Sequence, residues 1–371
     1  MFFLGKRWAK FVLLIIAGLW AGLQQALGQT QEIFLKNEHL NIKAEQYYIK
    51  KIIDERVNRT MVASLADVGT SLNNKTKSNT ADFAGGTQVA LQQFVLYNNL
   101  NVKSGFPLII RVKKFNATET TAANGSIQGK VILIMSFDVD KGDDEILHLS
   151  DYNGNAVYTR GIGPAQNMEP ALRQVFENGL IYINNWMNQS ISTNIKLARA
   201  VKVIFTDFSE KEEGDTIYYN PKRPLSWNDF QSRIQSNKFD AEVFPTIGYE
   251  ERNEVIKGVV VITMAMKVSL PKSANWVKEG SRNSYALNHE QRHFDIAKIA
   301  ALHFEQRIKA ENLPVNNYDG FINEAYLDAY REMNNMQKKY DDETRHGSDE
   351  LAQGQWNTFI DKELKKMILS P

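Results

Sequence analysis

The order of apolar and polar residues along the first half of the chain predicts a mixed α and β structure. Residues 105–115 and 127–138 are rich in β-branched and other apolar side chains, and they flank the dipeptide Asn124-Gly125. Both residues of that dipeptide tolerate a positive φ angle, so we expect the two runs to pair as antiparallel strands. Apolar residues at helical spacing predict two amphipathic helices, one at about 88–97 and one that begins near Pro170.

The pattern changes after a polar stretch at residues 188–194, which we interpret as a linker. Beyond it, residues 201–206, 215–219 and 255–270 are β-prone, and the last of these runs is interrupted only by Gly258. The remainder of the chain has the spacing of amphipathic helices. The second half therefore combines a small sheet with several helices.

The predicted fold class is α+β. A length of 371 residues fits two domains of ordinary size. We place an N-terminal α+β domain with an antiparallel sheet at residues 29–195. The domain with the small sheet and the helices follows at residues 200–371.

Residues 1–28 have the pattern of a secretory signal peptide. Basic residues precede an apolar run at 11–23, and Ala26-Leu27-Gly28 forms a cleavage site with small residues at its first and third positions. Cleavage there leaves a mature chain that begins near Gln29, and an uncleaved membrane anchor is the alternative. No later stretch is apolar for long enough to span a bilayer. We therefore expect a secreted or periplasmic protein with no membrane span after signal cleavage.

Composition narrows the possible functions. The chain has no cysteine, which excludes disulfides, thiolate metal sites, a cysteine nucleophile and a lipoprotein anchor. Its 44 basic and 43 acidic residues give a formal net charge of +1, so charge does not support binding to nucleic acid. The N-terminal domain has no recognisable chemical motif, and such a module is suited to docking an unknown extracytoplasmic partner.

One motif carries recognisable chemistry. His289-Glu290-Gln-Arg-His293 is an H-E-x-x-H sequence in a run from Ser284 to Asn312 without proline or glycine, and Ser284 is a candidate N-cap. On a helix the two histidines lie one turn apart and about 40° apart around the axis, so both imidazoles can bind one zinc ion. Glu290 is offset by about 100°, where its carboxylate can take a proton from water. The alternative is two surface histidines on an ordinary amphipathic helix.

A catalytic zinc site usually has three protein ligands, so a third is needed. His303 lies about 15 Å further along the same helix and cannot share the ion. Glu324 heads a Glu-x-x-x-Asp pattern on a later helix, but it falls on the face opposite the apolar stripe. His346 stands at a helix end, directly before Gly347. Residue types and spacing alone leave Glu324 and His346 open as the third ligand.

Four spaced motifs in the second half resemble a known bacterial family, domain of unknown function 922, whose members are described as predicted secreted zinc-dependent proteases. They are Leu-Ser-Trp-Asn-Asp-Phe at 225–230, Asn-Trp-Val at 275–277, the H-E-x-x-H segment, and Tyr-Asp-Asp-Glu-Thr-Arg-His-Gly at 340–347 with Gln-Trp at 355–356 soon after. The resemblance covers about residues 200–371 and implies a zincin-like architecture. It also implies His346, rather than Glu324, as the third ligand. Arg292 departs from the family pattern, which has a small residue there, usually glycine.

The residues and the resemblance together lead to the hypothesis of a zinc-dependent peptidase. Zn²⁺ held by His289, His293 and His346 would activate water, and Glu290 would act as the general base on a peptide or protein substrate. In zincins generally a strand before the helix binds the substrate backbone, and residues 259–270 occupy that place in the sequence. The candidates for oxyanion stabilisation are Tyr340, Arg345 and Arg292, and the candidates for orienting the histidines are Asp295, Asp342 and Glu343.

Two other interpretations remain open. In the first, the protein is a non-catalytic extracytoplasmic binding or assembly factor on a zincin scaffold. In the second, the zinc chemistry is kept, but the enzyme is an amidase that acts on cell-wall peptides.

Overall fold

The computed structural model describes residues 30–67, 79–103, 105–210, 212–236 and 238–369. The predicted signal peptide, residues 1–28, lies outside the described residues. Contacts within the chain divide it into two compact units, residues 1–191 and 192–371. Each unit contains both helices and β-strands, so the α+β fold class is confirmed.

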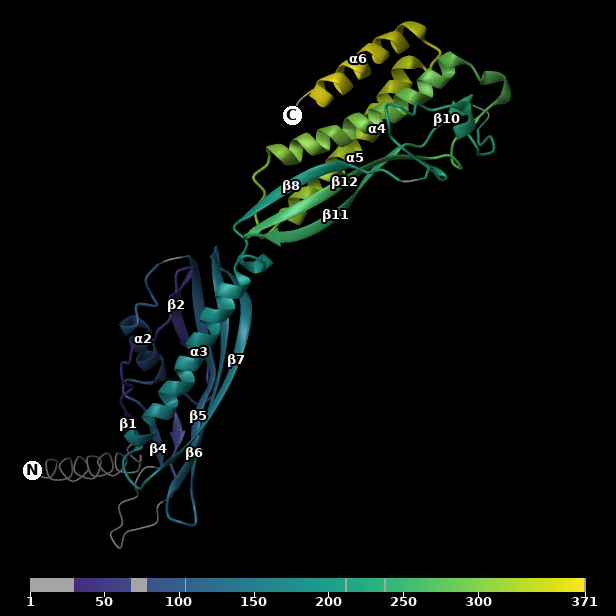
Figure 1. The fold of residues 1–371 in the computed structure, drawn as a ribbon. Helices are drawn as coiled ribbons and strands as arrows, with labels where there is room; N and C mark the ends of the chain where they lie inside the picture. The colour runs from purple at the N-terminus through teal and green to yellow at the C-terminus, as the bar shows by residue number, and fades with distance from the viewer. Residues whose placement is uncertain (1–29, 68–78, 104, 211, 237, 370–371) are drawn as a thin grey trace, which may run out of the picture. The chain divides into compact units, whose positions relative to one another are not determined.

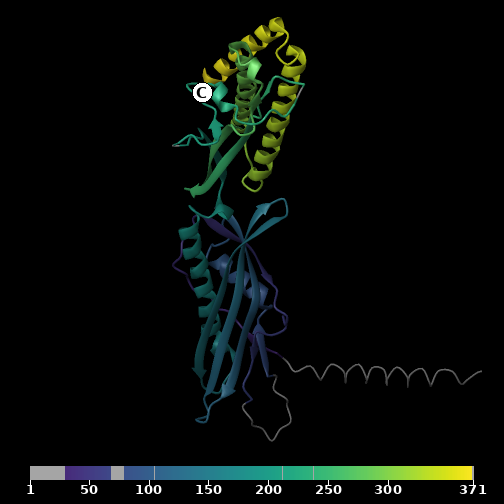
Figure 2. The ribbon, with the colours of Figure 1, turned by 90° about the vertical axis from the view of Figure 1, so that its right-hand side faces the viewer.

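Unit 1 is built on one mixed sheet, with strands in the order β1-β4-β3-β5-β6-β7 and with β2 paired to β5. Its long strands β5, β6 and β7 are antiparallel neighbours, whereas β2 and β3 run parallel to β5. Helix α3 lies along one face of these long strands (Figures 1 and 2). The bounds of the elements are β1 Gln31–Ile33, β2 Tyr47–Asp54, β3 Ala63–Ser64, β4 Thr80–Phe83, α2 Thr87–Tyr97, β5 Phe106–Thr121, β6 Ile127–Gly142, β7 Glu145–Arg160 and α3 Glu169–Ser190.

The hairpin and the two helices expected in this unit are confirmed. Strands β5 and β6 pair on either side of the Asn124-Gly125 turn, and Gly125 has a φ angle of 82°. Alternate residues of β6 from Val131 to Val139 are fully buried, as is the predicted apolar face of α3. Helix α3 ends at Ser190, inside the stretch that the sequence analysis interprets as a linker.

Unit 2 has a four-stranded sheet in the order β11-β12-β8, with β9 also paired to β12. The long β-prone run ends one strand and begins another, because Lys257 and Gly258 both take positive φ angles and form a hairpin turn. The bounds are β8 Ala200–Asp207, β9 Thr216–Tyr218, β10 Ala241–Glu242, β11 Thr246–Ile256, β12 Val259–Pro271, β13 Trp276–Val277, α4 Ser284–Ala310, α5 Tyr318–Thr344 and α6 Glu350–Leu369.

The expectation that residues 259–270 bind substrate by edge pairing is wrong. Strand β12 pairs with β11 along one edge, and with β8 and β9 along the other. Both rows of its backbone hydrogen-bonding groups are therefore occupied within the sheet. An extended peptide has no free edge of β12 to join.

Helix α4 packs on this sheet (Figure 1) through a face that includes Phe294, Ala297, Ala301 and Phe304, all buried. The helix begins as expected at Ser284, but its cap is the preceding residue. The side chain of Asn283 accepts a hydrogen bond from the backbone N–H of Ala286. Helices α5 and α6 pack against α4. His289 and Glu290, in the second turn of α4, are buried.

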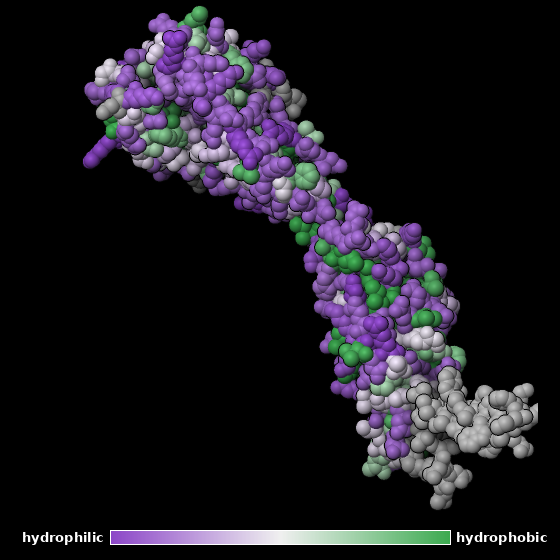
Figure 3. All heavy atoms as spheres, turned by 180° about the vertical axis from the view of Figure 1, so that it is seen from behind, coloured by the Kyte–Doolittle hydropathy of each residue, from purple (hydrophilic) through white to green (hydrophobic). Residues whose placement is uncertain are grey.

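Hydrophilic side chains predominate on the face of the molecule shown in Figure 3, and apolar ones form small separate areas. Among the described residues, no helix has the length and apolar character needed to cross a membrane.

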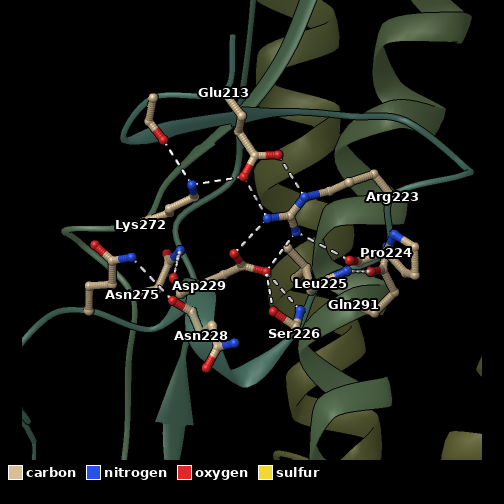
Figure 4. A network of polar contacts seen from close by, with 12 residues as sticks. Glu213, Arg223, Pro224, Leu225, Ser226, Asn228, Asp229, Lys272, Asn275 and Gln291 are labelled. Carbon is tan, nitrogen blue, oxygen red and sulfur yellow. Dashed lines mark hydrogen bonds and ion pairs between the residues drawn. The ribbon is translucent and has the colours of Figure 1, made fainter.

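A polar network holds the segment that precedes β10 against α4 (Figure 4). Arg223 donates to both carboxylate oxygens of Asp229, each at 2.7 Å, and also binds Glu213. Asp229 accepts further hydrogen bonds from the backbone and side chain of Ser226, which closes a capping box around the short helix at residues 227–229. One residue earlier, the backbone N–H of Leu225 donates to Oε1 of Gln291 on α4. The network thus joins the Leu-Ser-Trp-Asn-Asp-Phe segment to the helix that carries the H-E-x-x-H motif.

We expect replacement of Asp229 with asparagine to lower the free energy of unfolding of unit 2 by about 1–3 kcal/mol, because it weakens several hydrogen bonds to a buried charged group. The matched control is Glu213→Gln, which removes the exposed partner of the same Arg223 and should cost less than about 1 kcal/mol. Chemical denaturation of the two variants measures the difference. Equal losses of unfolding free energy in the two variants would show that the burial of Asp229 does not determine its contribution to stability.

The ion pair between Arg223 and Asp229 also predicts that the stability of unit 2 depends on pH. Burial raises the pKa of Asp229, but the hydrogen bonds from Arg223 and Ser226 outweigh it and hold the pKa below its ordinary value. A carboxyl whose pKa is lower in the folded state stabilises the fold above its unfolded pKa, about 3.9, and this contribution is lost as the pH falls through the folded pKa. The difference in stability between wild type and Asp229→Asn should therefore be full at neutral pH and shrink below about pH 4.

Candidate metal centre

The two histidines of the H-E-x-x-H motif lie together in the interior of unit 2. His289 and His293 are 6% and 8% exposed, and their ring centroids are 5.0 Å apart with the rings nearly perpendicular. Tyr340 of α5 stacks on His289 at 4.7 Å and contacts the edge of His293. Such burial is unusual for surface histidines of an amphipathic helix, so the helix presents both imidazoles to the inside of the unit.

A carboxylate that the sequence analysis did not single out faces both rings. Oδ1 of Asp341, on α5, lies 3.3 Å from Nε2 of His289 and 3.0 Å from Nε2 of His293. The ligand atoms of these three residues lie within 4.8 Å of one another. Burial raises the pKa of Asp341, but the two imidazoles beside it outweigh that effect and hold the pKa well below its ordinary value.

His346, the predicted third ligand, stands at the rim of this group. Helix α5 ends at Thr344, and Arg345, His346 and Gly347 all take positive φ angles as the chain turns toward α6. Nδ1 of His346 is 3.6 Å from Oδ1 of Asp341, and the ring packs on Phe239 with centroids 4.3 Å apart. Its side chain is 44% exposed. The structure thus brings His346 near the two buried histidines, with Asp341 closer to them.

Glu290 lies in the same cleft as the histidines. The cleft has a volume of about 870 Å³, and Glu290, His289, His293, Asp341 and His346 all line it. Glu290 is 5% exposed, and burial raises its pKa above the ordinary value, although the two histidines oppose the shift. Within the described part of the chain, its carboxylate has no hydrogen bond to another residue. That carboxylate is therefore available to a molecule in the cleft.

Two glutamines, rather than the expected acids, contact the Nδ1 atoms of the two imidazoles. Nδ1 of His289 lies 2.9 Å from Oε1 of Gln353 on α6, and Nδ1 of His293 is hydrogen-bonded to Oε1 of Gln337 on α5. Both arrangements leave Nε2 directed toward Asp341. Helices α5 and α6 thus each supply one residue that orients a ring of α4.

The three acids expected to orient the histidines have other partners or positions. Asp295 accepts hydrogen bonds from Tyr219, Gln291 and Arg292. Asp342 is exposed, and Glu343 accepts a hydrogen bond from the indole of Trp356. None of the three contacts a motif histidine among the interactions of the described residues.

The candidates for oxyanion stabilisation also lie away from the cleft, whose described lining includes none of them. The hydroxyl of Tyr340 donates to the backbone oxygen of His289 and accepts from Gln353. Arg345 is exposed at the end of α5. Arg292 is directed toward α6, where it binds Asn357 and Asp361.

Two other residues weighed as the third ligand, His303 and Glu324, lie outside the described lining of the cleft. His303 forms a hydrogen bond with Glu332 on α5, and Glu324 is exposed on the same helix. The expected position of Glu324, on the face opposite the apolar stripe, agrees with this exposure.

The Asn-Trp-Val motif, one of those that carry the family resemblance, supports residues that line the cleft. Asn275 is fully buried, and its side chain accepts from the backbone N–H of Phe244 in the cleft wall and donates to the backbone oxygen of Asp229. Trp276 is also fully buried, pairs with β10 in a two-stranded sheet and donates to Glu242, which lines the cleft. These side chains hold in place the part of the cleft lining that contains Glu242 and Phe244.

Comparison with protein families agrees with that resemblance. Residues 245–347 match the family described as bacterial protein of unknown function (DUF922). The matched segment includes the H-E-x-x-H motif, Asp341 and His346. The resemblance of the C-terminal part of the chain to DUF922 is therefore confirmed, and the family description assigns no function.

Comparisons with individual proteins add little to the DUF922 match. No curated protein matches the chain. Among solved structures, protein XCC0632 from Xanthomonas campestris, of the family DUF330, is 10% identical, with 43% of this chain and 94% of that chain covered and a TM-score of 0.28. A second crystal structure, of an uncharacterized protein, is also 10% identical, with coverages of 42% and 98% and a TM-score of 0.24. Neither likeness carries an inference about function.

The residues of the DUF922 segment fit a divalent metal ion. Asp341 Oδ1 is buried and has no hydrogen-bond partner among the described residues, although two imidazole nitrogens lie at 3.0 and 3.3 Å. Ligand atoms about 2.0–2.1 Å from a tetrahedral zinc ion lie about 3.3 Å from one another. Two imidazoles and one carboxylate also form a donor set that zinc accepts.

The turn after α5 gives a direct test of how the group is held. Gly347 has a φ angle of 78°, and a Cβ atom built there would lie 3.3 Å from Cγ and Nδ1 of His289. We expect Gly347→Ala to displace His289 and to cost about 1–2 kcal/mol in backbone strain. Metal affinity and thermal stability should both fall.

The matched control is Gly354→Ala on α6, where a Cβ atom meets nothing within 4 Å. A helical alanine at that site should raise stability by up to about 1 kcal/mol and leave metal affinity unchanged. Unchanged metal affinity in Gly347→Ala would contradict the proposed contact between this turn and His289.

Proposed function

We propose that this protein is a zinc-dependent hydrolase that cleaves peptide bonds outside the cytoplasm. The proposal is carried by one observation: His289, His293 and Asp341 direct three ligand atoms at one another beside the buried carboxylate of Glu290. Placement outside the cytoplasm rests on the signal pattern of residues 1–28. Docking of an extracytoplasmic partner by unit 1 is part of the same proposal.

The residues of this group would hold Zn²⁺ through Nε2 of each histidine and Oδ1 of Asp341. His346, predicted from the family resemblance to be a ligand, would contact the ion or the substrate at the rim. The ion supplies Lewis acidity, which makes water nucleophilic near neutral pH and polarises a carbonyl group. Gln353 and Gln337 hold the two rings in place during the reaction.

Glu290 is suited to move the protons. Its carboxylate lines the cleft beside both histidines and is free of bonds to other described residues. Its raised pKa brings its basicity closer to that needed near neutral pH. Glu290 would accept a proton from the attacking water at a carboxylate oxygen and then donate it to the nitrogen of the leaving amine.

The cleft sets limits on the substrate. A volume of about 870 Å³ accommodates a few residues of a peptide. One wall is formed by β10 and the segment that follows it, and the opposite wall by the start of α4. Because β12 is paired on both edges, the backbone of a bound peptide would lie along the wall at β10.

Replacement of Glu290 with glutamine tests the role of this residue. The variant keeps the shape of the side chain but cannot accept a proton, so we expect zinc content close to that of the wild type and a fall in turnover of about 10²–10⁴-fold. Metal analysis and hydrolysis of a peptide library measure the two quantities. Equal turnover in the wild type and the variant would rule out Glu290 as the base, and a zinc-loaded wild type that cleaves no peptide would support a scaffold role.

Two alanine variants test which residue completes the ligand set. We expect Asp341→Ala to lose at least about 100-fold in zinc affinity, more than the loss typical of an outer-shell residue. His346→Ala should keep one tightly bound ion per chain. The control is Asp342→Ala, which removes the exposed neighbour of Asp341 and should change nothing. Tight zinc binding in Asp341→Ala together with its loss in His346→Ala would instead support the ligand set predicted from the resemblance.

A further inference from the structure

The arginine inside the H-E-x-x-H motif is directed away from the cleft. The side chain of Arg292 is 14% exposed and packs toward α6. Its Nε donates to Oδ1 of Asn357 at 3.0 Å, and its Nη1 donates to Asp295 and Asp361. The position at which the family resemblance leads us to expect a small residue is therefore used for contacts behind the metal centre.

These contacts determine how the amide of Asn357 is oriented. Arginine has only hydrogen-bond donors, so Asn357 must offer its oxygen to Arg292. The same oxygen accepts a hydrogen bond from Nε2 of Gln353 at 3.1 Å. Gln353 Nε2 also donates to the hydroxyl of Tyr340 at 2.6 Å. Because Nε2 of Gln353 makes both of these hydrogen bonds, Oε1 of the same amide is directed toward His289.

The orientation of Gln353 in turn decides which nitrogen of His289 carries the proton. Oε1 of Gln353 and Oδ1 of Asp341 can both only accept a hydrogen bond, the first 2.9 Å from Nδ1 and the second 3.3 Å from Nε2. The shorter contact to Gln353 places the proton of the neutral ring on Nδ1. Nε2 is then left with a free lone pair facing Asp341 Oδ1 at 3.3 Å. A metal ion binds the unprotonated nitrogen of a neutral imidazole.

We propose that Arg292 is a positioning residue that, through Asn357 and Gln353, holds His289 in the tautomer that binds the metal ion. We call these three residues the Arg292 relay. The proposal rests on the metal site of the proposed function, and it adds a determinant of metal affinity that lies outside the cleft. In this chain the large residue at position 292 supports the ligand instead of blocking access to it.

His293, the second histidine of the motif, lacks the support that Arg292 and Asn357 give to His289. Gln337 binds His293 Nδ1 as Gln353 binds His289. Among the described residues, however, the amide nitrogen of Gln337 has no hydrogen-bond partner, and the residue lines the cleft. The relay therefore acts on His289 alone.

A simpler role for Arg292 is to tie α4 to α6 through its ion pair with Asp361. Asp361→Asn removes that ion pair and leaves the bond from Arg292 to Asn357. Arg292→Met and Asn357→Leu both break the relay, and Asn357→Leu keeps Arg292 and its two acids. In the double variant Arg292→Met with Gln353→Glu, a carboxylate that can only accept replaces the amide, and Asn357 is free to turn and donate to it.

The experiment measures the Kd for Zn²⁺ of the full chain by competition with a chromophoric chelator, with thermal melts to confirm folding. We expect Kd to rise about 10-fold in Arg292→Met and in Asn357→Leu, at the lower end of the 10–100-fold range for outer-shell residues. Asp361→Asn should match the wild type, and the double variant should recover most of the affinity. Unchanged affinity in Asn357→Leu, or an equal loss in Asp361→Asn, would overturn the relay.

A second readout does not depend on metal. The ring carbon chemical shifts of His289, measured in metal-free protein at a pH where the ring is neutral, should report a proton on Nδ1 in the wild type and a mixture of tautomers in Asn357→Leu. Identical tautomers in the two proteins would overturn the relay. A wild type that takes up no zinc would overturn the proposed function and the effect on affinity, while the tautomers still decide whether the relay orients His289.

Discussion

The contact between the carboxylate of Asp341 and the two imidazole nitrogens that face it governs the chemistry of unit 2. A buried carboxylate oxygen without a hydrogen bond is costly, because the charge has lost its water and gained no donor. Two histidines can offset that cost in either of two ways. They can take up a proton, or they can share a cation with the carboxylate through their lone pairs. The glutamines behind the rings contact Nδ1 and leave Nε2 directed inward, an arrangement that serves both.

The rest of unit 2 serves to keep these three side chains together. Helix α4 is fixed on the sheet by its apolar face, and the polar network around Arg223 and Asp229 attaches the preceding segment to Gln291. Helix α5 then supplies Gln337 and Asp341, one turn apart, and helix α6 supplies Gln353. The DUF922 match covers α4 and α5, whereas Gln353 lies just past its end. Support for His289 thus comes from a helix outside the matched segment.

Sequence patterns predicted the elements with strong periodicity and the chemistry on one helix. The H-E-x-x-H helix, the antiparallel hairpin of unit 1 and α3 were correct because their apolar residues recur at the period of the element. Strand β11 was not predicted, since Glu250 to Glu254 expose polar side chains and the strand is held by its pairing with β12. The position of β12 inside the sheet could not be read locally either, because strand order is a tertiary property.

The residues of the candidate site likewise differ in how far the sequence could predict them. Asp341 had only a weak signal, because it lies one turn after Gln337 but about 80° around the helix axis from the buried Met333. Gln353, Asn357 and Asp361 had no sequence signal, since they meet α4 only through the packing of α6.

The most direct test of the account is the ligand shell of the zinc-loaded protein, measured by X-ray absorption spectroscopy together with a crystal structure. The account predicts one ion per chain bound by two imidazole nitrogens and one carboxylate oxygen at about 2.0–2.2 Å, with Asp341 as the carboxylate. A shell of three imidazoles that excludes Asp341, or a protein that takes up no zinc, would contradict it.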